Sequence, residues 1–318
     1  MAAIPSPAAG TGLNHQHIAF IAMAALFAAA PLVVYPLFMM KVMCFALFAC
    51  AFNLLIGFGG LLSFGHAMFL GTAGYATAHA AKVWGLTPEL AIAFGTGCAA
   101  LLAWVSGLLA IRRQGIYFAM ITLALAQMVF FFYLQAKFTG GEDGIQAVPR
   151  GKLFGLIDLA NTAAMYTLVL AIFLGGFALI YRIVHSPFGQ VLKAIRENEN
   201  RAISLGYDTD RYKLLAYVLS GTLAGLAGAT KALVFQLATL TDVHWSMSGE
   251  VVLMTLLGGL GTIFGPVVGA AIIITMENYL AQLGHWVTVV QGVIFVVCVL
   301  AFRRGVIGEI AHWLKKPL

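Results

Sequence analysis

Apolar residues run through most of this chain in long stretches, each close to the length that crosses a membrane as a helix. A hydrocarbon core about 30 Å thick needs roughly 20 apolar residues per helix. A final stretch, 251–302, can hold three compact spans if the chain breaks near 265–266 and 284–285. The earlier spans are predicted at 18–40, 42–62, 64–83, 90–111, 116–136, 163–184 and 212–236. The pattern predicts an all-α polytopic transmembrane helical bundle of about ten spans, or of eight or nine if 251–265 is a re-entrant half-helix.

Composition agrees with this pattern. The 318 residues are 61% hydrophobic and only 9% charged, and the mean hydropathy is +0.94. A soluble domain carries about 25% charged residues. The chain is therefore predicted to be an integral membrane protein.

The positions of the cations predict a topology. Lys and Arg gather at 112–113, 182–213, 303–304 and 315–316, and such clusters mark the cytoplasmic side of a membrane. We therefore expect a transmembrane domain at 18–305, with segment 186–213 inside and loop 137–162 outside. Residues 1–17 and 306–318 are then cytoplasmic tails, the first of them disordered. The net charge of +6 follows from this topology, and no nucleic-acid signature accompanies it.

Segment 186–213 is the one long polar stretch between apolar spans. It carries Lys193, Arg196, Arg201, Arg211 and Lys213 against Glu197, Glu199, Asp208 and Asp210. This mixture is too balanced for a polybasic lipid-binding tail. It fits a docking helix for a soluble partner, with an ordinary cytoplasmic loop as the alternative. Gly206 is expected to end the helix as its C-terminal cap.

A weak internal repeat interrupts two apolar runs. GGLLSFGHAMFLG at 59–71 is similar to GGLGTIFGPVVGA at 258–270, with one gap allowed. Broken helices at matching positions are typical of a translocation path, although Gly-rich membrane helices can look alike by chance. Ser63, Phe64, His66 and Thr262 are the break residues predicted to line or support that path. His66 is an ionisable group at membrane depth, or else a neutral side chain bonded to freed carbonyl groups.

Two stripes of small residues predict close helix packing. Gly221, Gly225 and Gly228 share one face of the seventh span, and Gly261, Gly265 and Gly269 recur at every fourth position across the later break. Small residues at this spacing let two helix backbones approach closely.

Other chemistry is sparse. Cys44, Cys50, Cys98 and Cys298 lie in apolar runs without metal-ligand spacing, so they predict buried hydrophobes. No ATP-binding loop, metalloprotease motif or nucleophile elbow occurs. Glu277 and Lys231 are interpreted as helix-end residues, and no intramembrane carboxylate cluster is expected. The acidic turn at 139–144 is either a plain turn or a contact for an external partner.

Four stretches together carry a family resemblance: LLSFGHAMFLGTAGY at 61–75, RRQGIYFAMITLALAQ at 112–127 with TGGEDGI at 139–145, the long polar segment continuing to Ala229, and LLGGLGTIFGPVVGA at 256–270. In this order they resemble the inner-membrane permeases of bacterial branched-chain amino-acid ABC importers, and within them the M-type member of the H/M pair. The resemblance covers roughly residues 40–305.

The resemblance implies a set of partners. Such permeases pair with a homologous H-type permease and two cytoplasmic ATP-binding subunits, and a periplasmic solute-binding protein delivers the solute. ATP and Mg²⁺ would be bound by the partner subunits, with no cofactor in this chain. The resemblance places the coupling helix at 196–206, so Arg196, Glu197, Glu199, Arg201 and Gly206 are the expected ATPase contact.

The sequence says less about the transported solute than about the partner subunits. Related systems carry urea, short amides or aromatic and dicarboxylic acids, and the binding protein does most of the selecting. A stand-alone secondary transporter and a membrane-embedded enzyme are the alternative classes. The first would need paired intramembrane carboxylates, and the second would need a cluster of Asp, His or Arg near one interface.

Overall fold

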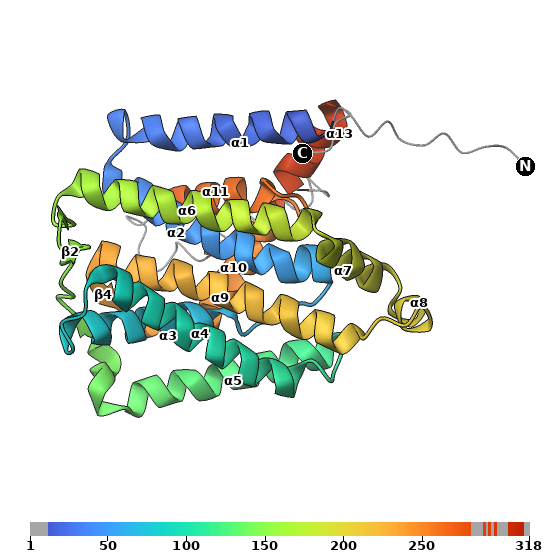
Figure 1. Cartoon of the computed structure of the whole chain (residues 1–318), viewed down its shortest axis with the longest axis horizontal. Coiled ribbons are helices and arrows are strands. Elements are labelled where there is room, and N and C mark those ends of the chain that lie inside the picture. Colours follow the sequence, from blue (N-terminus) through green and yellow to red (C-terminus); the bar gives the residue numbers. More distant parts are fainter. Residues whose placement is uncertain (1–11, 281–288, 291, 294–295, 298–304, 315–318) are drawn as a thin grey trace, which may run out of the picture.

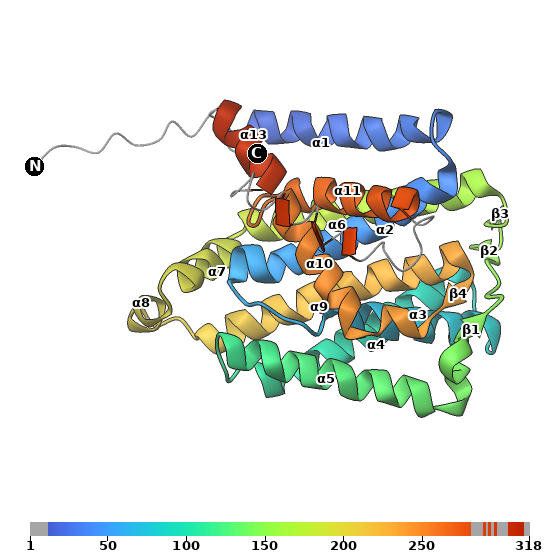
Figure 2. The ribbon, with the colours of Figure 1, turned by 180° about the vertical axis from the view of Figure 1, so that it is seen from behind.

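The computed structural model describes residues 12–280 and 305–314 and, between them, residues 289–290, 292–293 and 296–297. Long helices lie side by side along the long axis of the molecule (Figure 1; Figure 2). They are α1 (Gly12–Ala29), α2 (Pro36–Asn53), α3 (His66–Lys82), α4 (Pro88–Ala110), α5 (Ile116–Gln135), α6 (Thr162–His185), α9 (Thr209–Phe235), α10 (Trp245–Gly258) and α11 (Gly265–Leu280).

The polytopic bundle is confirmed. Within the described residues, five helices are long and apolar enough to cross a membrane: α4, α5, α6, α9, and α2 continued by the π-helical turn η2 (Leu54–Phe58). His17–Leu32 and α11 are shorter apolar helices. Helix α10 has 14 residues and so reaches only about 21 Å, which is less than the hydrocarbon core. The tenth expected span and the break near 284–285 lie mostly outside the described residues.

Helix ends near both tails and in the first span differ from the predicted ranges. Helix α1 begins at Gly12, inside the expected disordered tail, and α13 (Gly305–Leu314) occupies most of the expected C-terminal tail. The predicted span 18–40 is too long, because the chain turns through η1 (Ala30–Leu32) and restarts at Pro36. Pro36 stands in the first turn of α2, where its missing N–H costs nothing. The predicted spans 18–40 and 42–62 meet at Lys41, but Lys41 lies within α2.

The centre of the bundle is formed by α2 and α9. Every residue from 42 to 55 is buried, as expected for a helix that is apolar on all sides. Helix α9 contacts α2, α3 and α4. In contrast, α4 and α5 expose large apolar side chains, among them Leu101, Trp104, Met120 and Phe131. These outer faces suit lipid.

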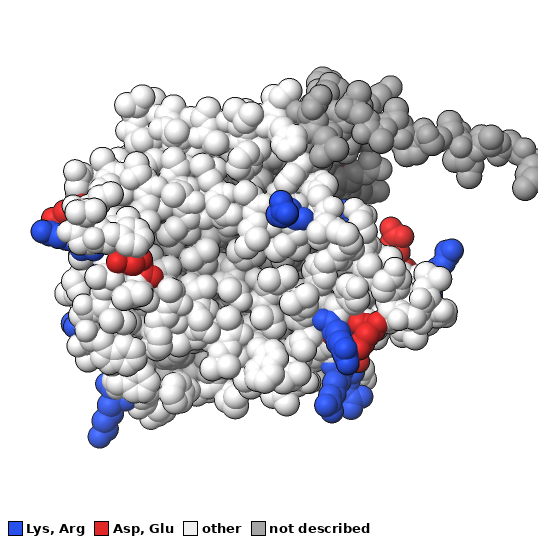
Figure 3. Space-filling model, in the orientation of Figure 1, with Lys and Arg blue, Asp and Glu red and all other residues white. Residues whose placement is uncertain are grey.

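The two ends of the bundle differ. At one end, which we call the α8 end, α7 (Pro187–Glu197) and α8 (Glu199–Ser204) extend beyond the long helices (Figure 1). At the other, the loop end, β1 (Ile145–Gln146) pairs antiparallel with β4 (Leu237–Ala238), and β2 (Lys152–Leu153) with β3 (Ile157–Asp158). Charged side chains gather toward these ends on the face seen in Figure 3.

Short 3-10 turns complete the loop end. They are η3 (Lys137–Thr139), η4 (Gly141–Asp143) and η5 (Leu240–Asp242). Gly140 and Gly144 have φ of 79° and 67°, a region that glycine adopts without strain. Residues 139–144 therefore form the tight turn that the sequence predicts.

Candidate functional site

The polar segment forms two short helices at the α8 end. Ser186 caps α7, accepting from the backbone N–H of Gly189 at 3.4 Å, and Asn198 caps α8, accepting from that of Arg201 at 3.0 Å. Such side chains satisfy N–H groups that a helix leaves without partners in its first turn. Asn198 has an extended backbone, with φ −157° and ψ 98°. This residue separates α8 from α7 as a distinct projecting unit.

Gly206 ends α8. The backbone N–H of Gly206 donates to Ile203 O at 2.9 Å, and that of Tyr207 to Ala202 O at 3.2 Å. With φ +89° at Gly206, this is a Schellman arrangement that satisfies the last carbonyl groups of the helix. The cap fixes the direction in which the chain leaves α8.

The surface of α8 and its cap combines apolar and charged side chains. Ile203, Leu205 and Tyr207 are 53%, 70% and 41% exposed, and Glu197 and Arg201 are exposed beside them. Exposed apolar side chains within a charged rim are typical of protein–protein contacts. We call Ile203, Leu205 and Tyr207 the α8 patch.

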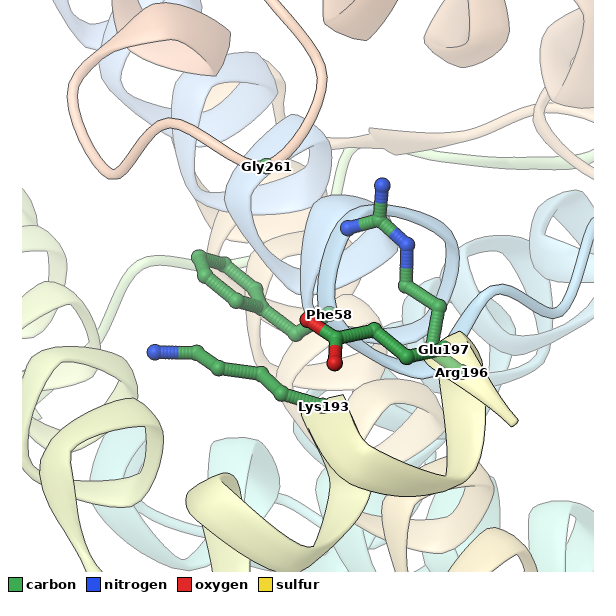
Figure 4. Close-up of a pocket in the computed structure, with 5 residues that line it drawn as sticks. All are labelled: Phe58, Lys193, Arg196, Glu197 and Gly261. Carbon is green, nitrogen blue, oxygen red and sulfur yellow. The ribbon is translucent and has the colours of Figure 1, made fainter. Parts of the chain in front are cut away.

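Arg196 links this segment to the membrane helices. Its Nη1 donates to the backbone carbonyl of Gly57, in the π-helical turn of α2, and Figure 4 shows the guanidinium reaching past that turn towards Gly261. Gly60 has φ +71°, and a Cβ there would lie 2.9 Å from Arg196 Cγ. Only glycine leaves room for this approach.

Helix α7 makes further contacts with the same turn. Lys193 Nζ lies 5.5 Å from the centroid of the Phe58 ring, within cation–π range, and Leu192 is fully buried beneath α7. Burial lowers the pKa of Lys193 below its ordinary value. Lys193, Arg196 and Glu197 line a pocket of about 510 Å³ together with Phe58 and Gly261 (Figure 4). The α7 face is thus shaped to the π-helical turn.

Asn53 connects that turn to the second break in the chain. Its Nδ2 donates to Thr262 O at 2.8 Å, and its Oδ1 accepts from the backbone N–H of Gly261 at 3.1 Å. The side chain is 2% exposed. One buried amide therefore pairs with both a donor and an acceptor of the loop between α10 and α11. Sequence reasoning missed Asn53, although it is the only Asn in the predicted span 42–62.

Glu199 points back into the protein. Its Oε1 accepts from Lys213 Nζ and, at 3.2 Å, from Thr209 Oγ1. Lys213 is 3% exposed, so this carboxylate neutralises a cation that has little access to water. Of the five predicted coupling residues, Arg196 and Glu199 therefore tie α7 and α8 to the bundle, Glu197 lines the open pocket at η2, and Arg201 is exposed.

The first break, at 59–65, is closed by hydroxyl groups. The backbone N–H groups of Phe64 and Gly65 donate to Thr122 Oγ1 and Ser63 Oγ, each at 3.2 Å, and that of Ala67 donates to Ser248 Oγ at 2.9 Å. Ser63 is fully buried and Phe64 half-buried. These residues therefore hold the break through hydrogen bonds made within this chain.

His66 belongs to the same buried layer. Its Nε2 lies 2.8 Å from Ser220 Oγ, which donates to Ala51 O at 2.5 Å. Because the Ser220 proton is used, Nε2 is the donor in this pair. The rings of Phe52, Phe69 and Tyr217 meet the imidazole edge to face. The other break candidate, Thr262, lies apart from His66 and donates to Gly259 O at 2.8 Å.

The predicted glycine stripes lie at close backbone approaches. A Cβ on Gly221 would stand 2.6 Å from the Cβ of Ala103 on α4. A Cβ would overlap Ala99 at Gly225 and the Leu70 carbonyl at Gly228, so α9 needs small residues against α3 and α4.

The second stripe shapes the later break. Gly261 has φ +75°, and a Cβ there would lie 3.3 Å from Gly57 O. At Gly265 a side chain would meet Thr262, and at Gly269 the carbonyl of Met254 on α10. These glycines let α10 and α11 pack as a broken pair beside α2.

Near the loop end, the predicted helix-end charges Glu277 and Lys231 have partners. Lys41 Nζ lies 3.3 Å from Glu277 Oε2, and Lys231 pairs with Asp242. Glu250 lies within electrostatic range of all four groups. Three carboxylates therefore gather around two lysines, a grouping that the sequence analysis did not anticipate. The residues come from separate helices and loops, so no local sequence pattern announces them.

Comparison with known proteins shows which family this chain resembles. The model of the family described as "Branched-chain amino acid transport system / permease component" matches residues 35–299. The high-affinity branched-chain amino acid transport system permease protein LivM of Escherichia coli (strain K12) is 24% identical over 297 residues, covering 86% of this chain and 70% of that protein. The ribose import permease protein RbsC of Bacillus subtilis (strain 168) is 30% identical over 239 residues, 70% of each chain. No solved structure matches significantly.

Proposed function

Because this chain belongs to the family of branched-chain amino acid transport permease components, we propose that it forms half of the translocation path of an ATP-driven bacterial importer for branched-chain, hydrophobic amino acids. The LivM relatives of Escherichia coli and Salmonella typhimurium, 24% and 23% identical, support this solute class. The site of action is the inner membrane.

The two ends of the bundle take different partners in this proposal. The α8 end faces the cytoplasm, with both chain termini, and the α8 patch docks on one of two ATP-binding subunits that hold ATP and Mg²⁺. The loop end, with residues 137–162, faces a periplasmic solute-binding protein. A homologous H-type permease completes the path, and lipid covers the apolar faces of α4 and α5. Segment 186–213 is the coupling segment of a transmembrane domain at 18–305.

One observation carries the coupling mechanism: Arg196 joins a projecting helix pair to an irregular turn of the central helix. Closure of the ATPase dimer would move α8, and α7 would move with it because its face fits η2. Through Arg196, Asn53 and Gly261 the displacement would reach the second break. A charge-assisted hydrogen bond is suited to such a link. Nucleotide would then shift the permease between outward-open and inward-open states through differential binding.

Glu199 attaches α8 to the bundle at a second place. Its pairing with Lys213 fixes α8 to the first turn of α9, so α8 cannot swing freely about Asn198. Force applied at the patch would therefore enter the bundle at two places, η2 and α9. Ser63, Phe64, His66 and Thr262 support the breaks next to the path in this proposal.

Substitution of the patch tests the docking step. We expect Leu205→Asp to weaken co-purification of the ATP-binding subunits and to lower uptake in proteoliposomes about tenfold, as for an apolar contact residue. The matched control for co-purification of the ATP-binding subunits is Leu156→Asp, which places the same charge on an 87% exposed leucine at the opposite, loop end. Equal co-purification and uptake for wild type and Leu205→Asp would refute the docking assignment.

A sugar is the second candidate solute, because the ribose import permease of Bacillus subtilis is 30% identical over 70% of this chain. Uptake of labelled leucine by the reconstituted complex, with unlabelled valine, ribose and urea as competitors, separates the candidates. Competition by valine alone supports the amino-acid assignment, and competition by ribose alone replaces it.

A further inference from the structure

The pocket beside η2 is lined by charged side chains of both signs. Lys193, Arg196 and Glu197 come from α7, and Phe58 and Gly261 complete the lining among the described residues (Figure 4). Its volume of about 510 Å³ is in the range of sites for small molecules. Arg196 and Glu197 are exposed and Lys193 is half-buried, so a molecule in the pocket can contact them.

These three charged groups do not neutralise one another. Lys193 and Glu197 are one helical turn apart, a spacing at which opposite charges commonly pair. However, Nζ of Lys193 lies over the Phe58 ring, and neither Lys193 nor Glu197 forms an ion pair within the described part of the chain. Arg196 donates to the carbonyl of Gly57, which carries no formal charge. Two cations and one carboxylate are thus held apart in one pocket.

This arrangement favours a ligand that carries both charges. A simple anion would be repelled by Glu197, and a simple cation by Lys193 and Arg196. A free α-amino acid has a carboxylate and an ammonium group on the same carbon atom. Its carboxylate can therefore meet the two cations while its ammonium group meets Glu197, and hydrogen bonds between ionised groups are stronger than those between neutral ones.

The apolar part of the pocket is small. Phe58 is 5% exposed, and Gly261 has no side chain. The side chain of a bound amino acid therefore gains little contact with the protein, because burial of apolar surface stabilises in proportion to the area removed from water. Recognition depends on the charged groups that all α-amino acids share.

We propose that this pocket binds free α-amino acids, irrespective of their side chains, with Lys193 and Arg196 as the contacts of the carboxylate and Glu197 as the contact of the ammonium group. The source of the ligand rests on the proposed function, because the α8 end must face the cytoplasm for the pocket to meet the amino acids of the cell. These include solute that the permease has released.

Saturation-transfer difference NMR tests the binding. The full chain, with the subunits that co-purify and without a solute-binding protein, is titrated with leucine in mild detergent while its aromatic protons are irradiated. We expect a Kd on the order of 1 mM, and a similar value for alanine. Lys193→Gln and Glu197→Gln should each raise the Kd of leucine about fivefold. The matched controls Lys152→Gln and Glu142→Gln, at exposed positions of the loop end, should leave it unchanged.

Ligand analogues show which group meets which side chain. N-acetylleucine keeps the carboxylate of leucine and lacks the ammonium group, so it should bind the wild type about fivefold more weakly than leucine does. In Glu197→Gln this difference should disappear, because the ammonium group has lost its partner. O-phosphoethanolamine represents a lipid headgroup with both charges, and tighter binding of this probe than of leucine would overturn the proposal in favour of lipid.

Two further results would also overturn it: no saturable transfer to leucine, or the same Kd in wild type, Lys193→Gln and Glu197→Gln. Uptake of labelled solute by the reconstituted complex separates this failure from that of the proposed function. Leucine uptake combined with an unchanged Kd in both variants would refute the pocket alone. Ribose uptake without leucine uptake, combined with the expected rise in Kd, would refute the proposed solute alone.

Discussion

The two breaks in the chain look alike in sequence and are held in different ways. The break at 59–65 is closed by hydroxyl groups of Ser63, Thr122 and Ser248, all deep in the bundle. The break at 259–264 is held by the amide of Asn53 and lies beside Arg196, whose helix extends outside the bundle. One break is sealed within the core, and the other is joined to a segment that a partner can reach.

This difference teaches where movement can enter the protein. A loop fixed by several short side chains from different helices can change only if those helices separate. A loop fixed through one long side chain from a surface helix responds when that helix shifts. We therefore expect substitutions at the second break to affect coupling, and those at the first to affect stability alone.

The largest effect on transport is expected for Arg196→Glu. The substitution removes the bond to Gly57 O and places a carboxylate against a carbonyl oxygen. Uptake in proteoliposomes should fall at least about tenfold, which corresponds to about 1.4 kcal/mol, while basal ATPase activity remains. Arg211→Glu, on an exposed arginine of the same segment, is the matched control. Retained uptake in Arg196→Glu would show that the second break is not driven from α7.

Asn53→Leu should destabilise the fold. It leaves the N–H of Gly261 and the carbonyl of Thr262 without their partner, and each buried unsatisfied group costs about 1–3 kcal/mol. Thermal unfolding in detergent measures the loss. Equal midpoints for Asn53→Leu and wild type would mean that the amide does not hold the break.

A smaller effect is expected at the first break. Ser248→Ala removes the acceptor of the Ala67 N–H, at a cost of about 1 kcal/mol, and should leave the ratio of transport to ATP hydrolysis unchanged. Ser246→Ala, two residues earlier on the exposed side, removes only an exposed hydrogen bond with His244 and should cost less. A changed coupling ratio in Ser248→Ala would remove the distinction between the two breaks.

The smallest effect is expected for Arg211, which lies outside both breaks. Arg211 pairs with Asp208 at 2.7 Å, but its side chain is 86% exposed. Exposed ion pairs contribute about 0–1 kcal/mol, so Arg211→Ala should leave both the unfolding midpoint and uptake almost unchanged. A large loss of uptake would instead place Arg211 in the partner contact.

Much of the fold could be predicted because each span is a local property of about 20 residues. The spans at 90–111 and 116–136 differ from α4 and α5 by no more than two residues at either end. The first span was placed less well, because the predicted spans 18–40 and 42–62 meet at Lys41, which lies within α2. Its positive charge is neutralised by Glu277, which lies too far along the chain for a local pattern to reveal.

The candidate site was predictable in part. Arg196 and Gly206 could be selected from charge and helix-capping patterns, whereas Gly57 could not, because its role is that of a backbone carbonyl exposed by an irregular turn. Asn53 carried a usable signal, as a lone amide in an apolar span, because a polar side chain at membrane depth needs a partner. Its partner is the backbone of a loop that has no side-chain signature.

The π-helical turn at Leu54–Phe58 has a consequence for the phase of α2. Each residue of an α-helix turns the chain by roughly 100° about the helix axis. A π-helical turn holds an extra residue, so the residues after it are displaced around the axis relative to a regular α-helix. The carbonyl of Gly57 therefore points in a direction that it would not take if α2 continued as a regular α-helix. Deleting one residue within the turn would restore the regular winding and rotate Gly57 away from Arg196. The angular offset of α2 therefore sets the position of the Gly57 carbonyl relative to Arg196, and α7 acts on α2 from that position.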